Sequence, residues 1–306
     1  MNFENVSHQS HGGWFEKQYP EAEERNEIIE KWLSAKKRHT VAYWLHERLF
    51  QLAAPLIKAN TSLLTVGDGY GFDAAYFQDQ GCQVTATDIA GTFLPLLKAR
   101  KLIGDCSVQN AEKMTFEDNS FDYVFCKEAY HHFPRPYMAV YEMVRVAKNG
   151  VILIEPHDPI SRMPLMLGLR NIVDRINPGI LQKYWKNRYS FEVVGNYVFK
   201  LSEREIEKLA LGINLPAVAF KGINNNYYSL KIHKELSEQT TDNSSSVYKK
   251  IKRKMFFHNI LTGLGLMPSQ VLCAVIFKIK PDDTIVQNLK KEGFIYYDFP
   301  SNPYLK

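Results

Sequence analysis

The stretch Leu63–Gly71, with the sequence LLTVGDGYG, decides which fold this chain can adopt. It opens with a short apolar run that is typical of a buried parallel strand, and it ends with glycines at alternate positions. A helical pattern follows, with Ala74, Ala75 and Phe77 on one side. A strand, a glycine turn and a helix N-terminus in succession offer a ligand a surface of bare backbone.

The spacing of Gly67, Gly69 and Gly71 separates this turn from most dinucleotide sites. A dinucleotide pyrophosphate usually requires G-x-G-x-x-G, and here the third glycine comes one residue early, which disfavours a nicotinamide oxidoreductase. The next expected strand, residues 83–87, ends at Asp88. A carboxylate there would accept hydrogen bonds from both hydroxyls of a ribose, so we expect a nucleoside beside the turn.

Alternating strand and helix patterns continue along the chain after this turn. The expected strands after the first are residues 83–87, 106–109, the second half of 116–126, 150–155, 216–220 and 271–279. Their connections are mostly short, which predicts an α/β fold with a Rossmann-like, doubly wound, mostly parallel sheet of seven strands. Residues 282–306 lie beyond the last expected strand, and we expect an extra tail there.

Composition divides the chain into five parts. Two charged helical patterns precede the first strand, and an irregular, aromatic-rich stretch separates the fifth strand from the sixth. We therefore expect N-terminal helices and a helical, aromatic cap inserted into the core. The predicted parts are an N-terminal helical extension (1–58), a cofactor-binding Rossmann-like core (59–157), a cap or substrate insert (158–202), the completion of the core with an inserted helix (203–280) and a C-terminal tail (281–306).

Residues 63–156 resemble the type 11 domain of class I S-adenosylmethionine-dependent methyltransferases. The glycine turn followed by Asp88 resembles motif I of that family, and the most specific part of the resemblance is Asn110–Asp122, NAEKMTFEDNSFD. Lys127–Phe133 resembles the family segment after the fourth strand, which faces the methionine part of the cofactor. Arg145–Gly150 resembles the turn into the fifth strand.

The resemblance implies that S-adenosylmethionine is the cofactor. In the family an acid or amide at the place of Asn110 contacts the adenine amino group, and a backbone amide beside it contacts the ring. The family usually carries an acid where this chain has Thr65, and Asp68 would take over part of its contact with the cofactor's ammonium group. The residues expected to bind the cofactor are Gly67, Asp68, Gly69, Gly71, Asp88, Ile89, Asn110, Ala111, Glu112 and Lys127.

Methyl transfer to a hydroxyl requires alignment of the reactants and a group that removes a proton. His131 and His132 follow the fourth strand and His157 follows the fifth, at the sheet edge where this group is needed. Each histidine is a candidate catalytic base, and each has a structural alternative, packing under the cofactor or holding a turn. A divalent metal bound by these histidines and Asp158 has no support from motif spacing, so we expect no metal.

The acceptor is predicted from the cap alone. An enclosed site favours a small molecule or a glycan, methylated at oxygen in our preferred reading, over protein or nucleic acid. The formal net charge of +5 is too small to imply nucleic acid by itself. Two alternatives stay open at this point, a non-catalytic methyltransferase-like partner subunit and an RNA methyltransferase.

One stretch calls for a membrane test. Met255–Phe277 contains no Asp, Glu, Lys or Arg, but polar residues and a turn at 268–270 interrupt it, so we expect a short helix, a turn and a strand. The basic run 249–254 before it predicts a solvated helix face, with binding of a phosphate-bearing substrate or peripheral contact to anionic lipid as the alternatives. The N-terminus lacks the features of a secretory signal, and the four cysteines lack metal-ligand spacing, so we expect a cytoplasmic protein with free thiols.

Overall fold

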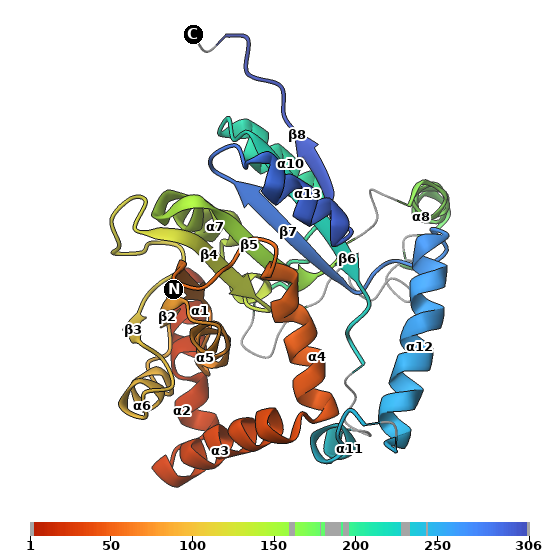
Figure 1. The fold of residues 1–306 in the computed structure, drawn as a ribbon. Helices are drawn as coiled ribbons and strands as arrows, with labels where there is room; N and C mark the ends of the chain where they lie inside the picture. The colour runs from red at the N-terminus through yellow and green to blue at the C-terminus, as the bar shows by residue number, and fades with distance from the viewer. Residues whose placement is uncertain are drawn as a thin grey trace.

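The computed structural model describes residues 3–158, 163–177, 179–180, 191, 196–227, 233–242 and 244–304. These residues form one eight-stranded sheet in the order β3-β2-β1-β4-β5-β7-β6-β8 (Figure 1). The strands are β1 Ser62–Val66, β2 Gln83–Asp88, β3 Asp105–Val108, β4 Phe121–Lys127, β5 Ala147–Pro156, β6 Ala217–Ile223, β7 Val271–Phe277 and β8 Ile295–Asp298. Neighbours from β3 to β5 pair in parallel, whereas β7 is antiparallel to both β5 and β6.

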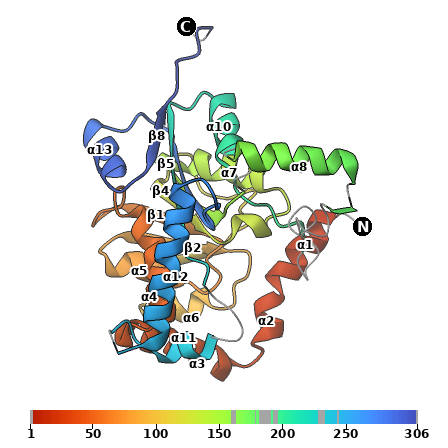
Figure 2. The same cartoon turned by 90° about the vertical axis from the view of Figure 1, so that its right-hand side faces the viewer.

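Helices cover both faces of this sheet (Figure 2). They are α1 Phe3–Gly12, α2 Trp14–Gln18, α3 Ala22–Arg38, α4 Val41–Phe50, α5 Phe72–Asp79, α6 Leu94–Ala99, α7 Pro136–Val146, α8 Pro164–Ile176, α10 Glu203–Gly212, α11 His233–Glu238, α12 Ser246–Gly263 and α13 Asp283–Lys291, with 3₁₀ turns η1 Gln51–Ala53 and η2 Tyr130–His132. The predicted doubly wound α/β architecture is therefore confirmed.

One prediction about the C-terminal end of the chain was wrong. Residues 282–306 are not merely a tail, because α13 buries Leu289 in the core and β8 pairs antiparallel with β6, which makes eight strands instead of seven. The cause is that the apolar residues of this segment find their partners in distant parts of the chain. At the other end, α1 and α2 agree with the expected N-terminal helices.

The core lies in two layers, one on each face of the sheet. Successive residues of a strand point to opposite faces, and accordingly Leu63 packs in one apolar cluster and Leu64 in the other. Every residue of β7 is buried because the strand lies between two others and is covered on both faces. This rigid sheet holds the carboxyl ends of β1, β2 and β4 in fixed relative positions.

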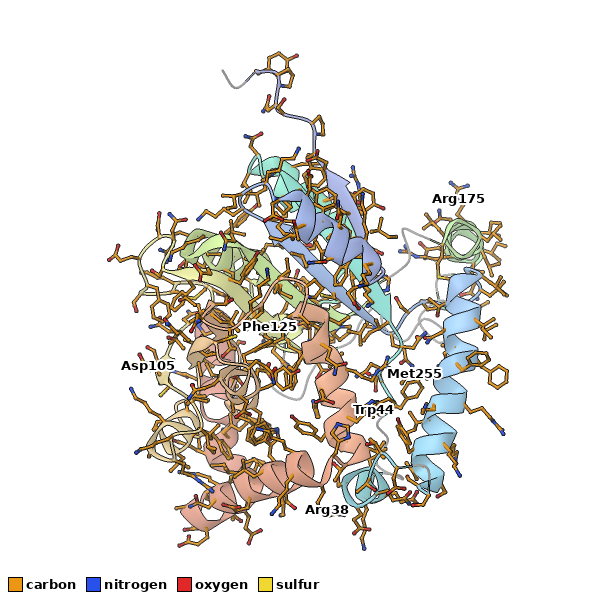
Figure 3. All side chains as sticks on the ribbon, viewed as in Figure 1. Arg38, Trp44, Asp105, Phe125, Arg175 and Met255 are labelled. Carbon is orange, nitrogen blue, oxygen red and sulfur yellow. The ribbon has the colours of Figure 1, made fainter. Side chains whose placement is uncertain are left out.

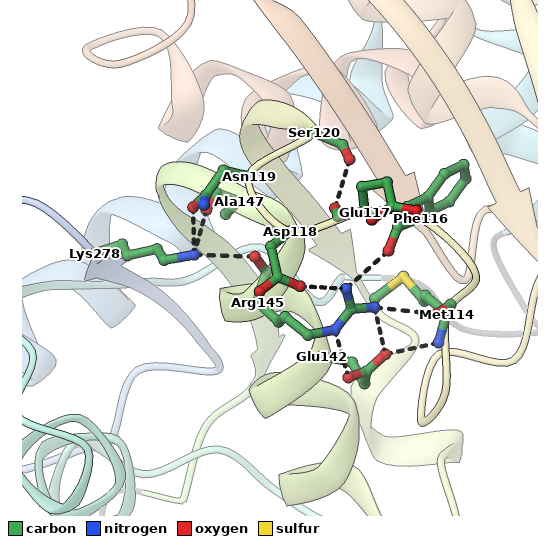
Figure 4. Close-up of polar contacts among 10 residues, drawn as sticks. All are labelled: Met114, Phe116, Glu117, Asp118, Asn119, Ser120, Glu142, Arg145, Ala147 and Lys278. Carbon is green, nitrogen blue, oxygen red and sulfur yellow. Dashed lines mark hydrogen bonds and ion pairs between the residues drawn. The ribbon is translucent and has the colours of Figure 1, made fainter.

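Arg145, near the end of α7, fastens the segment between β3 and β4 (Figure 4). Its guanidinium donates to the backbone carbonyls of Met114 and Phe116 and to the carboxylates of Asp118 and Glu142, at 2.8–3.0 Å. Part of the family-like run 110–122 is therefore held in place by α7.

A third apolar cluster joins α4, α11 and α12 outside the sheet. Its buried members are Val41, Leu45, Tyr227, Leu236, Val247, Ile251 and Met255. Figure 3 shows Trp44 of α4 and Met255 of α12 between these two helices. The Trp44 ring meets the Tyr248 ring edge to face at 5.0 Å. Among the described residues no helix is long and apolar enough to cross a membrane.

The predicted cap is only partly visible. Helix α8 opens it, and Phe191 and Tyr197 form an isolated bridge. Tyr184, Trp185 and Tyr189 of the predicted cap lie outside the described residues.

Candidate active site

A cavity of about 600 Å³ lies at the carboxyl ends of β1, β2 and β4. Its walls come from the glycine turn, the end of β2, the segment after β3 and the turn after β4. Residues of α1, α2, α3 and α4 also line it, so the N-terminal helices belong to the site. Of the thirteen predicted site residues, Gly71, His131 and His157 are the ones that do not line this cavity.

The glycine turn leaves no room for side chains. Gly67 has φ +73°, and a Cβ there would lie 2.3 Å from the Cβ of Ala129. A Cβ on Gly69 would lie 2.4 Å from the Phe15 ring and 3.3 Å from Oδ2 of Asp88. Gly71, with φ +72°, begins α5 and packs against Leu97. The first two glycines thus keep the cavity wall flat, and the third turns the chain into the helix.

Asp68 fastens the turn to α5. One of its carboxylate oxygens accepts from the backbone of Ala74 at 2.8 Å and the Thr65 hydroxyl at 3.0 Å, and the other accepts from the backbone of Asp73 at 3.3 Å. Burial raises the pKa of Asp68, against these hydrogen bonds. The acid missing at residue 65 is therefore replaced by a carboxylate that organises the loop, and the structure gives no separate support to the predicted contact with an ammonium group.

Asp88 faces the glycine turn, as predicted. Its Oδ1 accepts a hydrogen bond from the backbone of Ala90 at 2.7 Å, and its Oδ2 points toward Gly69. Burial raises the pKa of Asp88 to about 7. A neutral partner that donates hydrogen bonds, such as a pair of ribose hydroxyls, would stabilise the ionised form of this desolvated carboxylate.

The segment after β3 forms the wall next to Asp88. Asn110 and Ala111 line the cavity, and the Asn110 side chain accepts from the backbone of Glu112 at 2.9 Å. The buried carboxylate of Glu112 accepts from the backbone and the guanidinium of Arg135 and lies 3.7 Å from the imidazole of His8. Glu112 therefore connects this wall to α1 and to the start of α7.

Lys127 is a buried cation in the cavity wall. Its ammonium lies 3.2 Å from Asp73, 3.8 Å from Glu128 and 5.4 Å above the Phe50 ring. Burial lowers its pKa, but the nearby carboxylates raise it by more, so Lys127 keeps its charge. A fixed positive charge here is suited to hold a carboxylate end of a ligand.

The two histidines after β4 have different surroundings. His132 lines the cavity, whereas Nδ1 of His131 lies 2.7 Å from the buried carboxylate of Glu155. The other oxygen of Glu155 accepts from the backbones of Ala129 and Tyr130, both at 2.8 Å. The two imidazole rings lie 4.0 Å apart. Glu155 and His131 thus hold the turn that presents His132 to the cavity.

His157 lies away from the cavity. Its Nδ1 is 2.6 Å from the Ser269 hydroxyl and its Nε2 is 3.1 Å from Glu203. Its side chain is only 6% exposed, so an acceptor molecule has no access to the imidazole ring. The prediction of a base at this position finds no geometric support, and the structural alternative describes the residue: it ties the end of β5 to α10 and to the start of β7.

Sequence reasoning missed the contribution of the N-terminal helices. His8 and His11 come from α1, Trp14 and Phe15 from the start of α2, and His46 from α4. The only local signal was the i, i+3 spacing of the first two histidines, followed after two glycines by an aromatic pair. Burial, and then the charge of Lys127, lowers the pKa of His46 to about 4, so it stays neutral.

His11 packs edge to face against His132 in the cavity wall. The two ring centroids are 5.7 Å apart, and Nε2 of His11 lies 2.7 Å from the amide nitrogen of Asn196. That amide also contacts the backbone carbonyl of His132. Among the described residues no three histidine, cysteine or acidic side chains are placed to hold a metal ion.

Comparison with known protein families finds a match for the part of the chain that carries this cavity. A family model described as a methyltransferase domain, type 11, matches residues 64–154. The ubiquinone biosynthesis O-methyltransferases of three strains of Xanthomonas oryzae pv. oryzae are 34% identical over 111 residues. That match covers 34% of this chain and 45% of each relative, so the chain matches less than half the length of these curated relatives.

Solved structures with a similar arrangement are distant in sequence. A SAM-dependent methyltransferase from Thermotoga maritima is 14% identical, with coverage of 83% of this chain and 96% of that one and a TM-score of 0.48. Another from Methanosarcina mazei is also 14% identical, with coverage of 75% and 98% and a TM-score of 0.44. Likenesses at this level say nothing of substrate or partner.

Proposed function

We propose that the chain transfers a methyl group from S-adenosylmethionine to an oxygen of a small molecule or a glycan, starting from the match of residues 64–154 to a methyltransferase domain model. The observation that carries the proposal is the position of Asp88. Its carboxylate faces the flat wall at Gly69 inside a cavity large enough for a nucleoside and a second ligand. A hydroxyl-binding acid beside bare backbone is what an adenosyl group requires.

The residues around the cavity suit the two ends of this cofactor. Asp88 would hold the ribose, and the wall at Asn110 and Ala111 would hold the adenine. Lys127 is charged and lies at the end of β4, where it would attract the carboxylate of the methionine part. When bound, the cofactor supplies an electrophilic methyl group on a sulfonium. The chain supplies position and charge.

His132 is the proposed general base. It lines the cavity, and its turn is held by Glu155 through two backbone hydrogen bonds and through His131. Bound S-adenosylmethionine would supply the methyl group, and the electron pair of the broken carbon–sulfur bond would stay on its sulfur. A ring nitrogen of His132 would accept the proton of the acceptor hydroxyl. The aromatic side chains that line the cavity would help to hold the acceptor in line.

Oxygen is the preferred acceptor for two reasons. A histidine beside the cavity is the base that a hydroxyl needs at neutral pH, because a hydroxyl keeps its proton until the methyl bond forms. The curated relatives are named O-methyltransferases. Their match covers less than half of their length, so neither their acceptor nor any partner is carried over.

Calorimetric titration with S-adenosylhomocysteine tests the proposal. We expect micromolar binding to the wild-type chain and a loss of at least tenfold in Asp88→Asn, because the amide group presents an N–H to one ribose hydroxyl. Asp105→Asn is the matched control, since Asp105 begins the neighbouring strand, is largely exposed and pairs with Lys98 on the surface. No heat at millimolar ligand would favour a non-catalytic scaffold and end the proposal.

A second measurement identifies the acceptor class. Protein is incubated with cofactor carrying a labelled methyl group and with phenols, hydroxylated aliphatic compounds and glycans, and label in the product is counted. Transfer to one of these classes that is lost in His132→Ala supports oxygen methylation with a histidine base. Label found instead on RNA would replace the small-molecule acceptor with a nucleic acid.

A further inference from the structure

We propose that α8 and α12 together form a surface that binds the headgroup region of an anionic phospholipid bilayer. The two helices lie on the same side of the molecule, at the right of Figure 1 and nearest the viewer in Figure 2. In both views α8 lies next to the end of α12 that leads into β7. Neither helix contributes a residue to the cavity, so this surface is separate from the proposed methyl-transfer site.

Helix α8 presents an apolar stripe to solvent. Its exposed side chains recur at positions i, i+4, i+7 and i+11, which places them on one face of a helix. They are Leu165, Leu169, Ile172 and Ile176, from 57% to 88% exposed. A helix that packs on a core normally turns such a stripe inward, so this stripe is available to a partner.

The exposed side of helix α12 is charged in its first half and apolar in its second half. Val247, Ile251 and Met255 face the core at intervals of four residues. The first half of the outward side carries exposed cations, at Lys249, Lys250, Lys252, Arg253 and Lys254. The second half and the following turn carry large exposed apolar groups, at Phe256, Phe257, Ile260, Leu261, Leu264 and Leu266, from 39% to 70% exposed.

This order of charge followed by apolar groups matches the layers of a membrane surface. From Lys250 to Ile260 the helix rises about 15 Å, which is close to the depth of the headgroup layer plus the outermost acyl carbons. If the apolar end enters the acyl boundary, the cations lie among the lipid phosphates. Helix α8, which carries the exposed stripe, adjoins the same end of α12, and Figure 3 labels Arg175 on α8.

Charge selects the bilayer over a second copy of this chain. Residues 246–270 contain five basic residues and no acidic one. A two-fold dimer through this face would bring the same patch of each copy together, and its cations would repel one another. An anionic bilayer instead supplies the opposite charge and an apolar layer beneath it.

Sedimentation of the full chain with lipid vesicles tests the proposal. We expect binding to vesicles of phosphatidylcholine and phosphatidylglycerol at 7:3, and at least tenfold weaker binding to phosphatidylcholine alone. Replacing Lys249, Lys250 and Arg253 with Gln removes three cations and is expected to weaken binding to the anionic vesicles ~100-fold. The control replaces Lys290 and Lys291 with Gln. These two lysines at the end of α13 are exposed but lie outside this surface.

The apolar contribution is tested separately. Two double variants place charge where the acyl boundary is expected. One combines Phe257→Glu with Leu264→Glu, and the other combines Leu169→Glu with Ile172→Glu. Each is predicted to reduce binding at least tenfold. Ile279→Glu is the control, because Ile279 is 55% exposed and follows the opposite end of β7 from α12. Unchanged circular dichroism and unchanged binding of S-adenosylhomocysteine identify variants that are folded.

Three results would overturn the proposal. The wild-type chain could stay in the supernatant with both kinds of vesicle. It could bind vesicles equally well after the cationic and apolar substitutions, which would place the contact elsewhere. It could also form a dimer, detected by light scattering, that the glutamate pairs dissociate while no vesicle binding occurs. Because vesicle binding needs no methyl transfer, failure here leaves the proposed function standing.

Discussion

The carboxyl ends of β4 and β5 lie side by side in the sheet, but the histidines that follow them have different surroundings. After β4 the chain folds at once into η2, and His132 reaches the cavity. After β5 the space is filled, because the antiparallel β7 brings its first residues to this end of β5. Ser269, just before β7, meets His157 there. The direction of one neighbouring strand thus separates a cavity residue from a structural one.

The largest expected effect on kcat comes from His132→Ala, which tests the difference between the two histidines. If His132 is the base, kcat falls by about 10²- to 10⁴-fold, while binding of S-adenosylhomocysteine stays within about threefold. The measurement is steady-state kinetics with the acceptor found by methyl labelling, together with calorimetry. Equal losses of kcat in His157→Ala after correction for folded protein would erase the distinction between the two strand ends.

The next effect concerns the residue that holds the η2 turn. Glu155→Gln keeps the side-chain shape but replaces one acceptor oxygen with a donor. Either the carboxylate contact with His131 or both backbone hydrogen bonds, from Ala129 and Tyr130, are therefore lost. We expect kcat to fall about 10- to 100-fold through misplacement of His132, with KM for the cofactor little changed. Glu203→Gln, the equivalent change beside His157, is the control and should leave kcat unaltered. A higher KM for the cofactor with an unchanged kcat would contradict a positioning role for Glu155.

His157→Ala sharpens the other side of the comparison. The substitution leaves the Ser269 hydroxyl and the Glu203 carboxylate without this buried partner. Unfolding in urea should show a loss of about 1–3 kcal/mol in the free energy of unfolding. Activity per folded molecule should stay the same. A variant as stable as the wild type but inactive would return His157 to the catalytic candidates.

The smallest effect is the pH dependence of cofactor binding. The pKa of Asp88 is raised to about 7 by burial, and the ribose hydroxyls would bind its ionised form. Affinity should therefore rise about ninefold from pH 6 to pH 8, as the ionised fraction grows from about a tenth to about nine tenths. Asp88→Asn should remove this dependence in calorimetry. A pH profile that the variant shares with the wild type would assign it to another group.

The same shift has a consequence for the stability of the free protein. Because the folded state holds the Asp88 proton more tightly than the unfolded state does, this group's contribution to stability falls as pH rises between about 4 and 7. Binding of a ligand that favours the ionised form offsets this loss. The acid is therefore costly in the empty site, which is typical of a residue kept for binding.

Much of the sheet could be predicted because its signals are local. The run at residues 63–66 has the apolar pattern of a buried strand, and the glycines that follow it mark the turn into the next helix. The edge strand β8 was not predicted because few of its residues are buried and because its pairing with β6 joins residues about eighty positions apart. Local patterns cannot report such distant partners.

The cavity shows the same division between local and distant information. Asp88 was predicted because the end of a strand after a glycine turn has a defined place in this kind of sheet. His8, His11 and Phe15 were missed because their approach depends on how α1 and α2 dock against the strand ends. The contact of His8 with Glu112, more than a hundred residues away, has no counterpart in periodicity.

The sequence by itself determined the alternation of strands and helices from β1 to β5, the glycine turn and the acid at the end of the next strand. These follow from strand burial, backbone freedom at glycine and the fixed geometry of a parallel sheet. Tertiary structure alone decided that His132 enters the cavity and His157 does not, that the N-terminal helices cover the site, and that α8 and α12 leave their apolar faces in solvent. The physical reason is that each of these depends on contacts between distant segments, whose packing no local pattern encodes.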